Sequence, residues 1–388
     1  MNKVNFQQNL PTIGILGGGQ LAKMIALSAY PLGISVKVCV KKGADALPGI
    51  TGDVLEADWN DPNEVLNFSQ HVDIVTLENE FVNQESLELL EKSGKQLVPS
   101  SRSIRLIQDK WLQKESLLKA SLPIVSCQAV ESARDVVDFA NRFGWPVVLK
   151  RRHEGYDGKG NATIHNECQV DSAWEKLQVN QSGLFVEAFC PFEREIAVMV
   201  CRSISGEVAT YPVVDTVQKD HICHIVRAPS SLNPDLSAQA KSLALSAIES
   251  IDGHGVMGVE MFVTTKGDIL INELAPRVHN SGHYTIEACF CSQFENHVRA
   301  ILGWPLGSTN MKWPAAVMVN LLGQGDGPAR PMGLETALAM HGANIHIYGK
   351  NRSARGRKMG HVTATGNTIV EAEAIAITVA ESLRFGAT

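Results

Sequence analysis

The sequence lacks the features that would place the protein in a membrane or on nucleic acid. No run of about 18 apolar residues occurs, and the first residues, MNKVNFQQNLPTIG, contain neither the apolar segment of a secretory signal nor an Arg-rich amphipathic pattern. Basic residues are not in excess, since 35 Lys and Arg stand against 41 Asp and Glu for a net charge of −6. We therefore expect a cytoplasmic protein with no nucleic-acid partner and no membrane partner, whose basic sites are local.

Cysteine is present without the spacing of a zinc site or of a disulfide framework. The eight cysteines form no CxxC pair and no Cys/His ligand pattern. We expect them to be reduced, mostly buried thiols. They are Cys39, Cys127, Cys168, Cys190, Cys201, Cys223, Cys289 and Cys291.

The length of 388 residues predicts two or three domains, because a single core seldom grows beyond about 250 to 300 residues. Residues 12 to about 110 alternate strand and helix patterns, which predicts a doubly wound parallel sheet with helices on both faces. A helix predicted over residues 103–121 closes this unit. Strands and hairpins then dominate an α+β region, and a small β-rich region ends the chain. The predicted boundaries are 1–120, 121–308 and 309–388.

The segment IGILGGGQLAKM is a strand that runs into three glycines and a helix. Gly17, Gly19 and Ala22 have the spacing of a dinucleotide-binding turn, which aims helix N-terminal N–H groups at an anion. NAD binding also needs an acidic residue at the end of the second strand, but Lys41 and Lys42 stand there. Three interpretations stay open: a nicotinamide site, a structural turn, and a site for another anion such as a ribose phosphate.

The segment GVEMFVTTKGDILINE predicts a hairpin with two facing glutamates. A two-residue turn at Lys266 and Gly267 would place Glu260 directly opposite Glu273. Carboxylates about 5 Å apart repel unless a proton or a cation lies between them, and with Asn272 they offer the oxygen ligands that Mg²⁺ prefers. Two exposed glutamates that face solvent are the alternative.

Two further segments have the chemistry of a nucleotide site. The loop in KRRHEGYDGKGN is rich in glycine and could lie over a triphosphate, with Lys150 neutralising charge from the end of the preceding strand. In VEAFCPFERE, a strand that ends at Glu187 and a turn that leads to Glu195 could supply backbone groups to an adenine and a carboxylate to a ribose. A surface hairpin and an ordinary exposed strand are the alternatives.

Together these segments resemble the ATP-grasp superfamily, and within it the N5-carboxyaminoimidazole ribonucleotide synthetases. The resemblance rests on GGGQLAKM, GYDGKG, NELAPRVHNSGHYTIEACFCSQFENHVRAILGWPLG and YGKNRSARGRKMGHVT, which together extend over nearly the whole chain. It implies a pre-ATP-grasp (Rossmann-like) N-terminal domain, a central ATP-grasp domain and a small C-terminal domain. It also implies a homodimer.

The resemblance implies an ATP-dependent carbon–nitrogen ligase of purine biosynthesis. ATP would phosphorylate bicarbonate to carboxyphosphate, and the amine of 5-aminoimidazole ribonucleotide would capture this species or the CO₂ that it releases. Because carboxyphosphate hydrolyses quickly, a glycine-hinged lid that excludes water would be needed. The implied cofactors are ATP and Mg²⁺, with Glu260 and Glu273 as the metal ligands.

The resemblance carries a set of ATP contacts onto this sequence. They are Lys110, Lys150, Gly155, Tyr156, Asp157, Gly158, Lys159, Gly160, Asn161, Glu187, Ala188, Phe189, Cys190, Glu195, Asn272 and Glu273. It also implies contacts with the ribonucleotide, and two of these, Lys350 and Arg357, lie in a dense basic cluster that a phosphate monoester would explain. The ribonucleotide contacts are Gln20, Glu80, Tyr156, Asp157, Lys159, Arg277, His279, Asn280, Ser281, Lys350 and Arg357.

Catalytic roles are implied for Asp157, Arg277 and His279, with Asp157 and His279 as candidates for proton handling because the attacking amine must lose a proton. A binding role, or for His279 a structural one, is the alternative. The chain departs from the family at Gln218, where a histidine of the ATP site is common. We therefore assign no role to Gln218 or to the nearby His221.

Two other functions stay open on the sequence alone. Another ATP-grasp ligase, such as formate-dependent glycinamide ribonucleotide transformylase, would share the nucleotide site but not the NSGHYT and GRKMGHV segments. A nucleotide-binding regulatory module or an NADP-dependent reductase would instead depend on the glycine turn.

Overall fold

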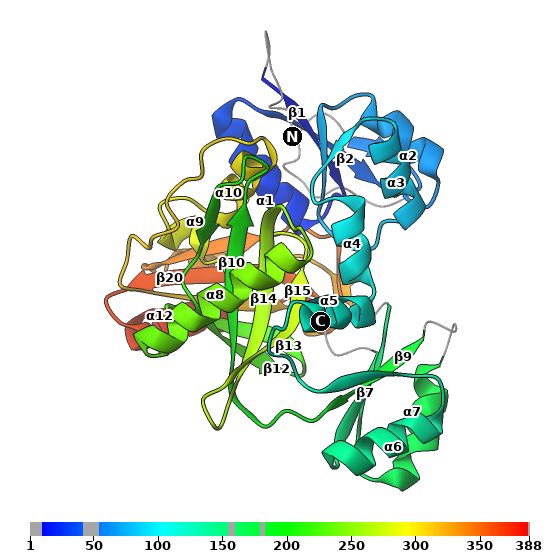
Figure 1. The fold of residues 1–388 in the computed structure, drawn as a ribbon. Helices are drawn as coiled ribbons and strands as arrows, with labels where there is room; N and C mark the ends of the chain where they lie inside the picture. The colour runs from blue at the N-terminus through cyan, green and yellow to red at the C-terminus, as the bar shows by residue number, and fades with distance from the viewer. Residues whose placement is uncertain (1–9, 42–53, 154–159, 179–182, 387–388) are drawn as a thin grey trace.

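The N-terminal part of the chain forms a parallel sheet with helices on both faces. The computed structural model describes residues 10–41, 54–153, 160–178 and 183–386. Its first sheet has the order β3-β2-β1-β4-β5, in which every pairing is parallel, as the alternating pattern predicts. The strands are β1 (Thr12–Leu16), β2 (Ser35–Val40), β3 (Val54–Glu56), β4 (Ile74–Leu77) and β5 (Gln96–Leu97). Helix α1 (Gln20–Ala29) lies on one face, and α2 (Pro62–Ser69) and α3 (Gln84–Lys92) lie on the other (Figure 1).

The single helix predicted over residues 103–121 is wrong, because the structure has two helices there. They are α4 (Ser101–Gln108) and α5 (Lys110–Lys119), and the chain turns at Asp109, whose backbone is extended. The Asp109 side chain accepts hydrogen bonds from the N–H groups of Trp111 and Leu112, and thereby caps α5. The break allows α5 to leave the axis of α4 and to reach the sheets that follow.

A small antiparallel sheet projects to one side of the molecule (lower right in Figure 1). Its order is β6-β9-β7-β8, and it packs through a core of its own against two helices. The elements are β6 (Cys127–Val130), α6 (Ala133–Phe143), β7 (Val147–Arg151), β8 (Asn161–Ile164), α7 (Val170–Leu177) and β9 (Leu184–Ala188).

The largest sheet has nine strands in the order β15-β14-β10-β12-β13-β16-β20-β18, with β11 paired to β10. The strands are β10 (Phe192–Arg202), β11 (Val208–Thr210), β12 (Val214–Lys219), β13 (Ile222–Ala228), β14 (Gly255–Thr264), β15 (Ile269–Ala275), β16 (Ala315–Leu322), β18 (Ala343–Ile347) and β20 (Lys358–Gly366). Because β13 pairs with β16, this sheet runs across the boundary predicted at residues 308 and 309. The domain boundaries themselves stay a prediction.

Helices cover both faces of the large sheet. α8 packs on one face of the strands β10, β14 and β15, while α10 fills the other face together with α1 of the N-terminal sheet. At the far end, α12 packs on β16 and β20. The bounds are α8 (Pro234–Ser250), α9 (Thr285–Ala288), α10 (Gln293–Ile301), α11 (Leu334–Leu338) and α12 (Ile369–Glu381), and β17 (Gly327–Pro328) pairs with β19 (Arg352–Ser353).

Two expectations from composition can be compared with the structure. All eight cysteines are free thiols, of which Cys39, Cys201, Cys289 and Cys291 are buried. Within the described ranges, no helix is both long enough and apolar enough to cross a membrane.

One hydrophobic cluster joins the N-terminal sheet to the large sheet through α1 and α10, with Phe294 fully buried inside it. We predict that Phe294→Ala lowers the free energy of unfolding by about 3–5 kcal/mol, because it removes a buried ring and leaves a cavity. Denaturant unfolding measures this loss. Phe290→Ala is the control, since the Phe290 side chain is 67% exposed, and its change should stay within about 0.5 kcal/mol. Equal effects of the two substitutions would contradict the packing described here.

Candidate active site

Glu260 on β14 lies directly opposite Glu273 on β15, as predicted. The predicted two-residue turn is wrong, because the Thr264 N–H already donates to the Asp268 carbonyl and three residues lie between them. With the observed three-residue loop alone, the register of the hairpin would place Asn272 opposite Glu260. A bulge that inserts Asn272 into β15 shifts the register by one residue and restores the pairing of the two glutamates.

The facing carboxylates fit a divalent cation. Burial and the charge of Glu273 raise the pKa of Glu260 to about 7, so the pair resists full ionisation without added positive charge. The Nε2 atom of His279 lies 3.5 Å from Glu260. Within the part of the chain that the structure describes, no group of three or more His, Cys, Asp or Glu side chains could hold a metal. A Mg²⁺ ion here would therefore take its other ligands from phosphates and water, which is its usual mode of binding at nucleotide sites.

Two lysines were predicted to bind ATP. Lys110 lies beside the facing glutamates, and Lys150 lies in the small sheet. Lys110 is the first residue of α5, and its Nζ atom donates to both carboxylate oxygens of Glu273, at 3.1 and 3.0 Å. Although burial disfavours its charge, Glu273 raises the pKa of Lys110. Lys150 on β7 forms an ion pair with the buried Glu187 on β9.

A third lysine, Lys114, was missed by the sequence analysis. Its ammonium lies 2.8 Å from a Glu187 oxygen and donates to the Asn272 carbonyl at 2.9 Å. The only signal in the sequence was its position four residues after Lys110 on a predicted helix, which places the two side chains on one helical face. Asp109 and Arg152 were also missed, and they form an ion pair that ties the start of α5 to the end of β7.

The predicted contacts for adenine and ribose lie at the junction of the small and large sheets. Glu187 and Ala188 end β9, and Phe189 and Cys190 follow, with Phe189 about half exposed. Glu195 on β10 accepts a hydrogen bond from Gln218. Burial raises the pKa of Glu195, while this hydrogen bond opposes the change.

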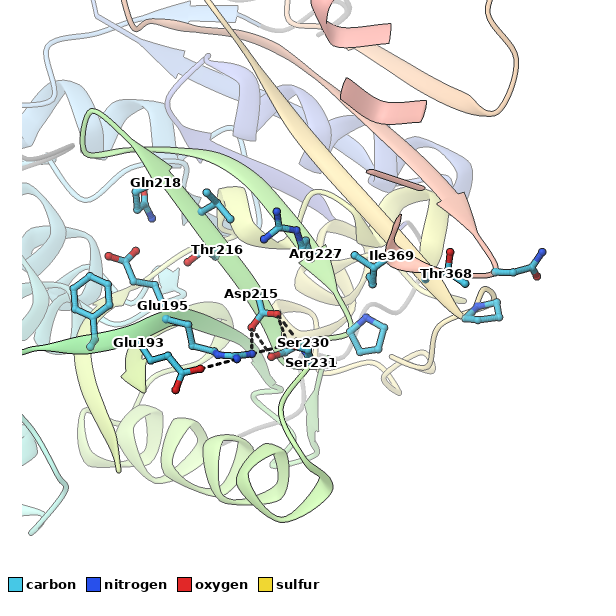
Figure 2. Close-up of a pocket in the computed structure, with 17 residues that line it drawn as sticks. Glu193, Glu195, Asp215, Thr216, Gln218, Arg227, Ser230, Ser231, Thr368 and Ile369 are labelled. Atoms are coloured by element: carbon cyan, nitrogen blue, oxygen red, sulfur yellow. Dashed lines mark hydrogen bonds and ion pairs between the residues drawn. The ribbon is translucent and has the colours of Figure 1, made fainter. Parts of the chain in front are cut away.

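A pocket of about 870 Å³ begins at Glu195 and extends along β12 and β13 to the start of α12 (Figure 2). Figure 2 shows Gln218 beside Glu195. Arg194, which also lines the pocket, forms an ion pair with Asp215 and donates a hydrogen bond to the Ser231 hydroxyl. Another lining residue, Arg227, forms an ion pair with Glu373 of α12 at 2.6 Å. Neither glutamate of the facing pair lines this pocket, so it adjoins the predicted ribose contact rather than the predicted metal site.

The glycine-rich loop is described only in part. Gly155, Tyr156, Asp157, Gly158 and Lys159 lie outside the described residues, so their predicted contacts stay predictions. Gly160 has a φ of +84° and accepts a hydrogen bond from the Arg151 N–H. Asn161 begins β8 and is exposed.

The glycine turn after β1 holds a carboxylate of the chain itself. Glu78, which follows β4, accepts hydrogen bonds from the N–H groups of Gly19 and Ala22, the latter at 3.1 Å. Burial raises the pKa of Glu78, while these N–H groups and the charge of Arg277 favour its ionised form. Since this carboxylate takes the N–H groups of the turn, the structure does not support a ribose phosphate at this position.

The second strand of the N-terminal sheet also disfavours NAD. Lys41, which follows β2, lies 5.2 Å from the ring centre of Trp59. The next residue, Lys42, lies outside the described residues. No acidic residue therefore ends β2 in the described part of the chain, and the nicotinamide interpretation loses its support.

Several predicted ribonucleotide contacts gather where β15 ends. Arg277 donates two hydrogen bonds to Glu80, at 2.7 and 3.3 Å. Burial alone would raise the pKa of Glu80, but the charge and hydrogen bonds of Arg277 hold this pKa below its usual range. Burial and the charge of Arg277 lower the pKa of His279 to about 3. The imidazole is therefore neutral at pH 7, and it can serve as an effective base only where a bound anion raises this pKa.

The two residues after His279 are buried. Asn280 exchanges hydrogen bonds with the amide of Asn320 on β16, at 2.9 and 2.6 Å, so its side chain joins the segment to the large sheet. The hydroxyl of Ser281 is buried and has no hydrogen-bond partner within the described residues. Gln20, by contrast, begins α1 and is only partly buried.

The basic cluster lies close to the glycine turn. Lys350 donates to the Lys358 carbonyl at 2.6 Å, and Lys23 of α1 donates to the Tyr348 carbonyl at 3.2 Å. Burial and the charge of Arg357 lower the pKa of Lys350 to about 8, although Glu78 opposes this change. Lys350 thus shares its electrostatic surroundings with Glu78.

Three family models match the chain in succession. They are the ribonucleotide synthetase preATP-grasp domain over residues 10–108, the ATP-grasp domain over residues 115–294, and the phosphoribosylaminoimidazole carboxylase C-terminal domain over residues 316–375. The chain is 40% identical to the N5-carboxyaminoimidazole ribonucleotide synthase of Synechococcus elongatus, in a match that covers 90% of this chain and 88% of that protein.

The phosphoribosylaminoimidazole carboxylase of Ogataea methanolica is 39% identical, and the match covers 93% of this chain but 68% of the relative. The chain thus spans about two thirds of the length of that relative. Among solved structures, N5-carboxyaminoimidazole synthase from Aspergillus clavatus in complex with ADP and 5-aminoimidazole ribonucleotide is similar. Its TM-score is 0.87 at 35% identity, over 96% of this chain and 99% of that chain.

The Glu78 contact predicts a specific effect at the glycine turn. Gly17 has a φ of +129°, and a Cβ atom there would lie 2.0 Å from the Glu78 Cγ. We expect Gly17→Ala to lower the free energy of unfolding by more than Gly206→Ala does, as measured by denaturant unfolding. Gly206 is the control because it also has a positive φ, +93°, but has nothing within 4 Å of its Cβ position. Gly206→Ala should cost only about 1–3 kcal/mol of backbone strain, and equal losses would contradict the close approach of Glu78.

Proposed function

Because the chain belongs to the N5-carboxyaminoimidazole ribonucleotide synthetase family of ATP-grasp ligases, we propose that it carboxylates 5-aminoimidazole ribonucleotide at the expense of ATP. The reaction consumes bicarbonate and yields N5-carboxyaminoimidazole ribonucleotide, ADP and phosphate, through carboxyphosphate, in purine (IMP) biosynthesis. The observation that best supports this proposal is the continuity of β15 with the segment after it. Glu273 at the predicted phosphate end and Arg277 at the predicted ribonucleotide end lie four residues apart, so the two half-reactions would occur side by side.

Mg²⁺ is the metal that we propose for Glu260 and Glu273. When bound there with ATP, it would neutralise charge on the phosphates during phosphoryl transfer. The chain's own groups support the same step, because Lys110 lies against Glu273 and Lys150 is held at the facing sheet by Glu187. We propose that the two lysines bind the phosphates, that Glu195 binds the ribose, and that the backbone from Glu187 to Cys190 binds the adenine.

The ribonucleotide would occupy the region between Arg277, Lys350 and the Gln20 side chain, with its phosphate at Lys350 rather than at the N–H groups of the glycine turn. Glu80 orients Arg277 through a two-point contact, which suits a guanidinium that must bind an anionic carboxyl group or a phosphate. We propose that His279, which is neutral, accepts a proton from the attacking amine once a bound anion has raised its pKa. The contacts assigned to residues 155–159 belong to this proposal as well.

We also propose a homodimer that works in the cytoplasm. The dimer rests on the family resemblance, and the compartment rests on the free cysteines and on the substrates. A relative from Vigna aconitifolia is named as a chloroplastic enzyme, so the compartment varies within the family.

The experiment that tests the proposed function is an assay of ADP release with two substrate pairs. Aminoimidazole ribonucleotide with bicarbonate should support turnover, whereas glycinamide ribonucleotide with formate should not. Turnover that required the second pair would overturn the proposal in favour of a transformylase.

Glu273→Gln should abolish ATP turnover while the fold stays intact. The substitution removes one of the two facing carboxylates and the partner of Lys110, and we expect kcat to fall at least about 100-fold. Glu175→Gln is the matched control, since Glu175 is exposed on α7. Near-normal ADP release by Glu273→Gln, with unchanged thermal unfolding, would refute the assignment.

The pKa of Lys350, about 8, predicts a pH dependence of ribonucleotide binding. Below this pH the ammonium is charged and can bind a phosphate monoester, and above it the charge is lost. We expect kcat/KM for the ribonucleotide to fall about tenfold per pH unit above pH 8, because this ratio reports groups of the free enzyme. Lys350→Arg should remove the fall, since a guanidinium stays charged. The same profile for both proteins would show that another group titrates.

A further inference from the structure

Lys114 is a buried lysine that has no assigned role in the proposed reaction. Its side chain is 4% exposed, and its ammonium has two oxygen neighbours on different sheets, Glu187 of β9 and the Asn272 carbonyl of β15. Burying an ammonium costs several kcal/mol unless close opposite charges and hydrogen bonds compensate it. An apolar residue would fill the same space without that cost, so the charge itself calls for an explanation.

The first contact of Lys114 falls on the bulge that brings the two facing glutamates together. The inserted residue is Asn272, and its carbonyl accepts from Lys114 at 2.9 Å. The preceding residue of α5 is Gln113. Its side-chain amide accepts a hydrogen bond from the Leu274 N–H at 3.0 Å and donates one to the Leu274 carbonyl at 3.3 Å. Side chains of helix α5 therefore form hydrogen bonds with the backbone of the edge strand β15 directly before and directly after Glu273.

The contact of Lys114 with Glu187 determines how much of the Lys150 charge Glu187 neutralises. Glu187 lies between Lys114 and Lys150, with one carboxylate oxygen directed to each. Burial alone would favour the neutral acid, yet the two lysines lower the pKa of Glu187 to about 2, so it is a full carboxylate at pH 7. Two ammonium groups and one carboxylate carry a net charge of +1. Without Lys114 the group would be neutral, and Glu187 would hold Lys150 as its only partner.

We propose that Lys114 is a positioning residue of the nucleotide site. By sharing Glu187 it leaves Lys150 with unneutralised positive charge for the ATP phosphates, and its hydrogen bond to the Asn272 carbonyl holds the Lys114 ammonium beside Glu187. This inference rests on the proposed ATP site, but not on the identity of the second substrate.

The test measures the effect of Lys114→Met on the Kd of Mg²⁺-ATP in two backgrounds, by titration calorimetry without ribonucleotide. In the otherwise unchanged protein, we expect the Kd to rise about tenfold. In a Glu187→Gln background, the same substitution should change the Kd less than twofold, because no carboxylate remains to capture Lys150. A purely structural role would give the same loss in both backgrounds. Lys119→Met, on the exposed side of the same helix, is the control and should leave the Kd unchanged.

Three results would overturn the inference. They are a Kd for Lys114→Met within twofold of the unsubstituted protein, a tenfold loss in both backgrounds, and a loss equal to that of Lys119→Met. Thermal unfolding checks that each variant is folded, and if Lys114→Met alone does not fold, the comparison in the Glu187→Gln background decides. Failure of ribonucleotide-dependent ADP release in the unsubstituted protein would overturn the proposed function and leave this binding test intact.

Discussion

The repulsion between Glu260 and Glu273 is the interaction on which the rest of the site depends. Two carboxylates that face each other about 5 Å apart across an antiparallel hairpin are stable only if positive charge or a proton lies near them. Lys110 supplies part of this charge to Glu273. The pKa of Glu260, raised to about 7 by burial and by Glu273, means that the compensation from the chain is incomplete. A cation that arrives with an ATP phosphate group would complete it.

Helix α5 connects this pair to the other wall of the site. Within one short helix and its cap, Asp109 pairs with Arg152 directly after β7 of the small sheet, Lys110 pairs with Glu273 of the large sheet, and Lys114 contacts both sheets. The break between α4 and α5 makes this possible, because it sets α5 at its own angle. The same short segment therefore contacts both sheets and carries positive charge to a carboxylate on each of them.

The sequence predicted the parts of the structure that depend on local pattern. Strand–helix alternation predicted the parallel sheet, and hairpin pairing predicted the facing glutamates, although a three-residue loop and the bulge at Asn272 replaced the assumed turn. A bulge leaves no periodic signal, and neither does a contact between distant segments. Glu78 at the glycine turn and Lys114 between two sheets depend on such contacts, so only the folded chain reveals them. The break at Asp109 had a local signal, since Asp is a good helix cap, but the surrounding apolar pattern favoured one continuous helix.

We propose that the Glu260/Glu273 pair binds the metal that accompanies ATP, and the protons released on binding distinguish this site from others. A carboxyl group with a pKa of about 7 is about half protonated at pH 7, and a cation that binds there must displace that proton. Titration of Mg²⁺-saturated ATP in two buffers of different ionisation enthalpy should therefore show a release of about half a proton per site at pH 7. The release should vanish at pH 9 and in Glu260→Gln. Equal proton release by Glu260→Gln and the unsubstituted protein would show that the metal does not bind at Glu260.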